Sequence, residues 1–563
     1  MPEPRPHDAG ATEGHRRPRL RDHPLLLALT IAGTVIETIV LSALGQRAAT
    51  GLAPQGTAAP PFGVFHDLRW LLVFHRSWWS FAGEGLALIG ARTLLVASLV
   101  AAAWPRDVVL PRFRTLLRRA AVFVTVSAVL LLPSAALLFG LAVVPVSWLF
   151  FVAVPTALIV AFVVHHAVAG NGGWRSTPTL RTVGWVALTF LILTVAAGTV
   201  TAAPWYPARL AAAAAAGLFN AWAWLGIVHS VVRRTDPVPV PVAPIGVAVL
   251  AGIVVGGAAI GFSTVSGSSE LRGDVEARPP KAGRPVLLVT GFASDWNGST
   301  SNHLPGAFAE WRFSYRGVGP GGLPAPYDAG DTDRPLSALV DTMDRQVRAL
   351  AARTGQDVAV VAESEGALLA KTYLLARPGV PVSDLVLLSP LVDPARVYYP
   401  PPGQDGWGMV AGRILAAAAA GIRWVSPLKL SANGPLLRGI VDRVALRRSL
   451  ACRVPHVREQ ALFPLADAVA PPHVSDFGIP TEVVPSFHGG LLGDVDAQRA
   501  IALALQHREL PHRAVLHVAE RAIRYGASAW QVPMLPPALN DAWTSPPDDC
   551  AAVRASLAAS LRR

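Results

Sequence analysis

The sequence predicts two successive parts, an all-α transmembrane helical bundle and then an α/β domain with a mostly parallel sheet. The 563 residues are 52% hydrophobic and only 15% charged, with a mean hydropathy of +0.41, which is more apolar than is usual for soluble chains. Long Ala, Val and Leu runs end near Phe262. After Arg284, short β-branched runs alternate with helical patterns, as in a parallel sheet covered on both faces. The stretch 263–284 between them is polar and contains Pro and Gly, so we expect a linker there.

Seven segments of the first part are long and apolar enough to span a membrane, for which a helix needs about 20 mostly apolar residues. The segments are Pro24–Gly45, Gly85–Trp104, Ala120–Gly140, Pro145–Val168, Thr182–Ala202, Ala208–Val232 and Val242–Phe262. The first is too long for a secretory signal and has no clear cleavage site, so we interpret it as a span. Residues 24–262 are therefore expected to form an integral, multi-pass domain in the lipid bilayer, after a basic N-terminus at 1–23.

The positions of the arginines predict the orientation. The chain has 49 Lys and Arg against 37 Asp and Glu, a formal net charge of +12. Basic residues in short loops favour the cytoplasmic side, and here they cluster before the first span and in every second loop, at Arg16, Arg17, Arg19, Arg21, Arg106, Arg112, Arg114, Arg118, Arg119, Arg175, Arg181, Arg233 and Arg234. We expect a cytoplasmic N-terminus in the cell membrane and, after an odd number of spans, an extracytoplasmic C-terminal domain. The charge is then a topology signal, and no nucleic-acid partner is expected.

Two features of the membrane half depart from a simple bundle. The loop from Arg47 to Glu84 is rich in aromatic residues, but its apolar runs are too short to span. We expect an amphipathic or re-entrant piece at the outer interface; if the loop spans instead, the orientation of everything after it inverts. Glu37 and Arg92 lie inside expected spans, where charges are costly. A structural ion pair between two helices is expected, and a polar path is the alternative.

One serine in the α/β part has the surroundings of a catalytic nucleophile. Ser364 follows the strand pattern Val358–Ala362 and precedes an apolar helix. A tight turn from strand to helix exposes the hydroxyl and needs small residues two positions before and two after it. Ala362 and Gly366 meet that need. The helix N-terminus behind the serine also favours developing negative charge.

This segment resembles the nucleophile elbow G-x-S-x-G of the α/β-hydrolase fold, with Ala362 in place of the first glycine. The resemblance covers residues 285–510 and implies a triad in the chain order Ser, acid, His. Asp467 follows the strand QALFPL and His488 follows the strand TEVV. The resemblance thus implies Ser364 as nucleophile, His488 as base and Asp467 as the orienting acid. Asp393, one strand earlier, is the alternative acid; the alternative bases, which follow no strand directly, are His456, His473 and His512.

The resemblance also implies an oxyanion hole and a lid. The hole would use the backbone N–H groups of Glu365 and of Phe292, which follows the first core strand. Glu363 and Glu365 flank the serine; an acidic pocket is one expectation, and side chains exposed at the turn are the alternative. The fold usually carries a lid where this chain has an apolar, helical insertion, at about 394–459. A packed structural helix is the alternative.

The chain has two cysteines, Cys452 and Cys550, and both lie in its second half. One disulfide is expected if this half lies in an oxidising compartment, and two buried free thiols are the alternative. A bridge would hold the C-terminal extension, residues 511–563, against the junction between the insertion and the next strand.

Together these features predict a membrane-embedded serine hydrolase, esterase- or lipase-like, that cleaves a lipid or cell-envelope acyl ester. The expected triad needs no cofactor or metal. An extracytoplasmic acyltransferase would use the same acyl-enzyme and is an alternative. A membrane transport or scaffold protein, whose hydrolase-like domain only binds a partner, is a second alternative.

Overall fold

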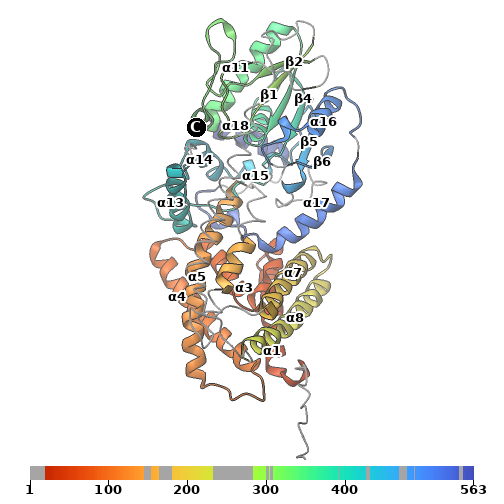
Figure 1. The fold of residues 1–563 in the computed structure, drawn as a ribbon. Coiled ribbons are helices and arrows are strands. Elements are labelled where there is room, and N and C mark those ends of the chain that lie inside the picture. Colours follow the sequence, from red (N-terminus) through yellow and green to blue (C-terminus); the bar gives the residue numbers. More distant parts are fainter. Residues whose placement is uncertain are drawn as a thin grey trace, which may run out of the picture.

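The computed structural model describes residues 20–144, 154–163, 180–232, 283–299, 304, 308–391, 393–425, 431–467, 478–486, 488–510, 512–543 and 549–562. The chain forms a helical half and an α/β half, stacked one on the other (Figure 1). The C-terminal extension runs along the boundary between the two halves before it returns to the α/β half.

Five helices in the described residues are long and apolar enough to cross a membrane. They are α1 (Pro24–Ala43), α4 (Trp78–Ala102), α5 (Phe113–Val143), α7 (Leu180–Ala202) and α8 (Tyr206–Val232). They correspond to the predicted spans one, two, three, five and six, as expected of a multi-pass membrane protein. Of the predicted fourth span, only the short apolar helix Val154–Val163 is described. The seventh and most of the linker lie outside the described residues, and a total of seven stays a prediction.

The two ends of the helical bundle have different neighbours. At one end, the guanidinium of Arg106, in the basic loop between α4 and α5, donates to the carbonyl of Asp22 just before α1. At the other end, the N–H of Ala395 in the α/β half donates to the carbonyl of Val143, the last residue of α5, over 3.0 Å. The basic loop and the α/β half therefore lie at opposite ends of the bundle (Figure 1).

The aromatic segment after α1 lies inside the protein. It forms η2 (Arg47–Leu52), α2 (Ala53–Gly56) and α3 (Phe62–Val73), and α3 is buried along nearly its whole length between α4, α5 and the extension. Phe62 and Phe65 pack against Trp530, with ring centroids 5.9 and 6.4 Å apart. Phe62 and Phe65 therefore fill a protein core, whereas Trp78 and Trp79, at the start of α4, are exposed. The amphipathic or re-entrant position of this segment at the outer interface stays a prediction.

Glu37 and Arg92 do not pair with each other; each has a partner on α3, so the expected ion pair between helices forms with a different carboxylate. The Arg92 guanidinium contacts both carboxylate oxygens of Asp67, at 2.7 and 2.5 Å. His66 Nε2 lies 2.7 Å from Glu37 Oε1, and its Nδ1 lies 3.1 Å from Asp67. This network joins α1, α3 and α4, and it supplies the partners that charges require away from water.

Six parallel strands form one sheet in the described α/β half, in the order β2-β1-β3-β4-β5-β6. They are β1 (Arg284–Val289), β2 (Phe308–Arg312), β3 (Val358–Glu363), β4 (Val382–Leu388), β5 (Arg458–Pro464) and β6 (Thr481–Val484). Every residue of β3 is buried, as expected of a central strand with helices on both faces. The predicted mostly parallel sheet is confirmed.

Helices cover both faces of this sheet. Alternate strand residues serve opposite faces: Val360 belongs to a core with α11, α12 and α18, whereas Val361 packs with α16. These helices are α11 (Leu336–Thr354), α12 (Glu365–Ala376), α16 (Val495–Leu505) and α18 (Cys550–Arg562). The shorter elements are η1 (Leu20–Asp22), η4 (Pro320–Gly322), α10 (Ala329–Thr332), η5 (Leu465–Asp467), η7 (Leu491–Gly493), η8 (Ser528–Trp530) and η9 (Pro537–Leu539).

The insertion between β4 and β5 packs against the helical half. It contains α13 (Met409–Val425), α14 (Pro435–Val441) and α15 (Leu446–Ser449). The N–H of Val410 donates to Nε2 of His75, over 2.7 Å, and α13 contacts α3, α4 and α5. The helical nature of the insertion is as predicted, and its position is that of a structural connector.

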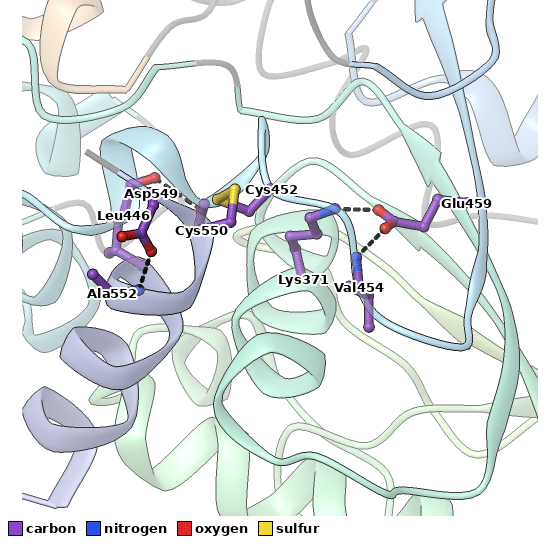
Figure 2. Close-up of a disulfide and its surroundings, with 9 residues drawn as sticks. Lys371, Leu446, Cys452, Val454, Glu459, Asp549, Cys550 and Ala552 are labelled. Carbon is purple, nitrogen blue, oxygen red and sulfur yellow. Dashed lines mark hydrogen bonds and ion pairs between the residues drawn. A yellow bond between two sulfur atoms is a disulfide. The ribbon is translucent and has the colours of Figure 1, made fainter. Parts of the chain in front are cut away.

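Cys452 and Cys550 form a disulfide, with Cα atoms 5.3 Å apart (Figure 2). The bridge fixes the start of α18, whose Val553 and Leu557 are buried in the core beside α12. Beside the bridge, the buried Lys371 ammonium of α12 pairs with the carboxylate of Glu459 in β5 (Figure 2). The end of the extension therefore belongs to the core of the α/β half.

Candidate active site

Ser364 occupies the tight turn between β3 and α12. Its φ is +55°, a backbone conformation that costs free energy for any residue with a side chain and is concentrated at functional sites. A Cβ added at Gly366 would lie 2.6 Å from the carbonyl oxygen of Thr290 and 2.8 Å from that of Val289, so only glycine fits there. The small residue expected two positions after the serine is therefore required by the close approach of β1.

The hydroxyl of Ser364 lies in a chain of hydrogen bonds with the two other residues predicted from the resemblance. Its Oγ is 2.8 Å from Nε2 of His488, and Nδ1 of His488 is 2.8 and 3.0 Å from the two carboxylate oxygens of Asp467. Ser364 follows β3, Asp467 ends η5 directly after β5, and His488 follows β6. Three carboxyl ends of parallel strands thus bring together residues that are up to 124 positions apart.

The imidazole of His488 is only 7% exposed. Burial by itself would lower its pKa, but the charge of Asp467, the hydrogen bond that Nδ1–H donates to that carboxylate and the charge of Glu363 together raise the pKa above its ordinary value. Asp467 therefore stabilises the protonated imidazole and also fixes the ring, with Nε2 toward the serine. This is the arrangement that a general base beside a nucleophile needs.

The alternative residues lie elsewhere. The carboxylate oxygens of Asp393 face Arg396 and Arg447, at 3.7 and 3.9 Å, and the loop that carries them touches the end of α5. Asp467, and not Asp393, thus contacts the imidazole. Of the alternative bases, His512 bonds Glu482 on another part of the surface and His456 is exposed. His473 lies outside the described residues.

A pocket opens beside Ser364 and His488. Its walls come from the loop after β1, the end of β2, the turn after β3 and the loops after β6, at Thr290, Gly291, Phe292, Ser294, Arg312, Glu363, Gly489 and Leu492. A Cβ at Gly291 would lie 3.0 Å from Cβ of Ser364 and 3.4 Å from its Oγ. The loop that carries Phe292 thus passes directly beside the serine, on the side where the resemblance places one oxyanion donor. Glu365, the other expected donor, is the first residue of α12.

The described part of the insertion contributes no residue to the walls of this pocket. Its helix α13 lies against the membrane helices instead, with Leu415 next to Gly140 of α5. The prediction of a lid is therefore wrong for this part of the insertion. Its apolar face matches the bundle, which explains the amphipathic pattern without a lid.

Both glutamates beside the serine are buried, so the alternative that they are exposed at the turn is wrong, and Glu363 lines the pocket. Glu363 accepts a hydrogen bond from the N–H of Leu491 over 2.8 Å, and burial raises its pKa. Glu365 is 1% exposed, and neither carboxylate oxygen has a hydrogen-bond partner among the described residues. Burial, reinforced by the charge of Asp333, raises the pKa of Glu365 well above its usual range.

Arg312 is a pocket residue that the sequence analysis missed. It ends β2, and its Nε and Nη2 atoms are buried without a hydrogen-bond partner among the described residues. Arg312 as a whole is half-buried, but buried guanidinium nitrogens without a partner are costly unless water or a ligand completes them. Its position at the carboxyl end of a strand could have identified it as a pocket residue, because functional residues of parallel sheets collect at the carboxyl ends of strands.

The pocket lies on the edge of the sheet that faces the membrane helices. The loop after β4 bonds to the end of α5, since the N–H of Arg396 donates to the carbonyl of Ala142 over 3.1 Å. The extension helix α17 (Ala514–Ala527) touches η5 and β6 on one side and α7 on the other. Figure 1 shows α17 running between the sheet and the bundle. The carboxyl ends of the strands are therefore the ends nearest the membrane half.

Comparison with known proteins does not assign a family or a function to this chain. No protein-family model, curated protein or solved structure matches the chain.

Proposed function

We propose that the protein is a membrane-embedded serine hydrolase of the α/β-hydrolase type that cleaves a carboxylic ester. The observation that carries the proposal is the hydrogen-bonded chain from Ser364 through His488 to Asp467. The elbow at the end of β3, with its positive φ and its obligatory glycine, and the all-parallel sheet support the same family.

The proposed reaction proceeds through an acyl-enzyme. Ser364 Oγ attacks the ester carbonyl while His488 Nε2 takes its proton, and Asp467 stabilises the imidazolium that forms. The backbone N–H groups of Phe292 and Glu365 hold the negative charge on the carbonyl oxygen. The intermediate collapses, and the alcohol leaves with the proton from His488. A water molecule then attacks the acyl-enzyme by the same steps, which releases the acid and restores the serine.

The position of the pocket supports an acyl ester from the membrane or cell envelope as the substrate. The pocket faces the helical half, so a lipid substrate would have a short path to Ser364. The two guanidinium nitrogens of Arg312 that have no partner among the described residues favour an ester that carries a phosphate or carboxylate near the scissile bond. Because the basic loop lies at the opposite end of the bundle, the positive-inside rule favours an extracytoplasmic pocket.

Labelling with a fluorophosphonate probe tests the activated serine. Membranes that contain the wild-type protein should be labelled, and Ser364→Ala and His488→Ala should abolish the label. Ser294→Ala is a matched control, because Ser294 lines the same pocket but its hydroxyl bonds Thr290 and Tyr327. Persistent label in Ser364→Ala would overturn the proposed nucleophile.

The same preparation separates the alternative functions. An acyltransferase forms the same acyl-enzyme, so chromogenic esters should be turned over with and without added alcohol, and the products should be identified. Acyl transfer in preference to hydrolysis would assign a transferase. If no probe reacts and Ser364→Ala leaves the cellular phenotype intact, a transport or scaffold role would be favoured.

A further inference from the structure

Three metal-binding side chains converge on the surface of the α/β half, outside the proposed active site. Nδ1 of His512 lies 3.2 Å from Oε1 of Glu482 in β6, and Nε2 of His517 in α17 lies 2.9 Å from Oε2 of the same carboxylate. The two imidazole rings are stacked, with centroids 4.5 Å apart. One ligand atom from each of the three residues lies within 4.8 Å of the others.

We propose that Glu482, His512 and His517 bind a divalent transition-metal ion of the Zn²⁺ class. Two imidazoles and one carboxylate are a common three-ligand set for zinc, which leaves the fourth position to water. With metal–ligand distances of about 2.0–2.2 Å, tetrahedral geometry puts ligand atoms roughly 3.3 Å apart. The separations of 3.2 and 2.9 Å run to the two different oxygens of Glu482, and all three ligand atoms lie within 4.8 Å of one another, so the side chains must rotate to bring one oxygen and both nitrogens onto the ion. Nitrogen ligands disfavour Mg²⁺ and Ca²⁺, which select oxygen.

The support around the three side chains favours a site over a chance surface cluster. Glu482 and His517 come from a strand and a helix, and their side chains are only 15% and 18% exposed, so little freedom is lost when they bind. His512 is 63% exposed and leaves the ion accessible from solvent. Without a metal, both imidazoles must donate to the one carboxylate. An ion would accept both nitrogens and the carboxylate together.

The position of the site gives the ion a structural role. It would join β6, which leads to His488, to α17, which also contacts η5 and the membrane helix α7. A bound ion would therefore fasten the extension to the strand before the active-site loop. This inference does not depend on the proposed hydrolase activity, because the three residues take no part in it.

Zinc binding by the full-length protein in detergent tests the site. After chelator treatment, the protein is titrated with Zn²⁺ alone by calorimetry and with Co²⁺ by visible absorption. We expect one ion per chain and a higher Tm with Zn²⁺. His512→Ala, His517→Ala and Glu482→Gln should each weaken binding by more than the roughly 10–100-fold typical of outer-shell changes, and should lose the rise in Tm. Glu482→Gln keeps a hydrogen-bond acceptor and guards against a folding defect.

Two controls make the outcome decisive. His456→Asn removes an exposed histidine elsewhere, at a positive φ of 64° that Asn tolerates, and should bind Zn²⁺ like the wild type. Ser364→Ala should also bind Zn²⁺ normally, so the metal site and the proposed nucleophile are tested separately. The proposal is overturned if the three cluster variants bind as tightly as the wild type, or if several equivalent weak sites respond only to the total number of histidines.

Discussion

Loss of the bridge between Cys452 and Cys550 is expected to destabilise the α/β half. The two residues are 98 positions apart. Closing a loop of about 100 residues restricts the unfolded chain by roughly 4.7 kcal/mol in the chain-entropy treatment, and removal of native bridges costs about 2–5 kcal/mol. For a domain of this size, each kcal/mol lowers Tm by about 2–4 °C, so we expect a fall of roughly 10 °C.

The measurement is thermal unfolding of the full-length protein in detergent, with and without a reducing agent. Cys452→Ala combined with Cys550→Ala should reproduce the fall in Tm that reduction causes in the wild type. Reduction should not change the double variant, which controls for effects of the reagent on the membrane half. The denatured wild-type protein should react with a maleimide only after reduction.

Two results would refute this reasoning. If two cysteines react with maleimide without reduction, the bridge is absent in the protein made by the cell, and the inference of an oxidising compartment loses its support. If the bridge is present but its loss leaves Tm unchanged, α18 is held by packing alone. Val553 and Leu557, buried beside α12, would then be the residues to change next.

Other perturbations test the pocket and the bundle. Asp467→Asn should lower kcat for a chromogenic ester by about 10⁴-fold, because the imidazole loses its orientation. Asp393→Asn should leave kcat nearly unchanged. The reverse result would make Asp393 the acid of the triad. Because the pKa of His488 is raised and the base acts when neutral, the acidic limb of kcat/KM should lie above the ordinary histidine range and move to lower pH in Asp467→Asn. Arg312→Gln should raise KM about tenfold for esters with a phosphate or carboxylate, since a charge-assisted hydrogen bond contributes about 1.5–3 kcal/mol. KM for neutral esters should not change. An equal rise in KM for charged and neutral esters would contradict an anion site. Gly366→Ala should cost about 1–3 kcal/mol, seen as a lower Tm, because its Cβ would meet two carbonyl oxygens of β1 and its loop. Asp67→Asn should also lower Tm, because the Arg92 guanidinium loses its charged partner. An unchanged Tm would mean that water solvates the Arg92 guanidinium.

Local patterns predicted much of the α/β half. Parallel strands end at one edge, so Ser364, Asp467 and His488 could be identified from the strand that precedes each. No property of the sequence near Asp393 distinguished it from Asp467, because both follow a strand. Which of the two aspartates meets His488 depends on the paths of the loops after β4 and β5. The loop after β4, which carries Asp393, turns toward α5.

The wrong predictions concern burial that comes from distant partners. Nothing near Phe62 and Phe65 in the sequence shows that Trp530 covers them, so their burial by the extension could not be predicted. The insertion has the same apolar face whether it covers a pocket or packs on α5. Glu363 and Glu365 are buried by packing of the turn against other elements, which their own neighbours in the sequence do not reveal.

The packing of the extension on the segment before α4 also dictates an order of assembly. The carbonyl of Ala529 accepts a hydrogen bond from the side-chain amide of Gln55, 474 positions earlier. At about 5–20 residues per second, the ribosome needs roughly 25–95 s to make the stretch between them. During that time Gln55, Arg69 and the rings of Phe62 and Phe65 lack the chain that covers them in the finished protein. The packing of the helical half is therefore complete only after most of the α/β half has been synthesised, and a chain truncated before Ala529 would leave these side chains uncovered.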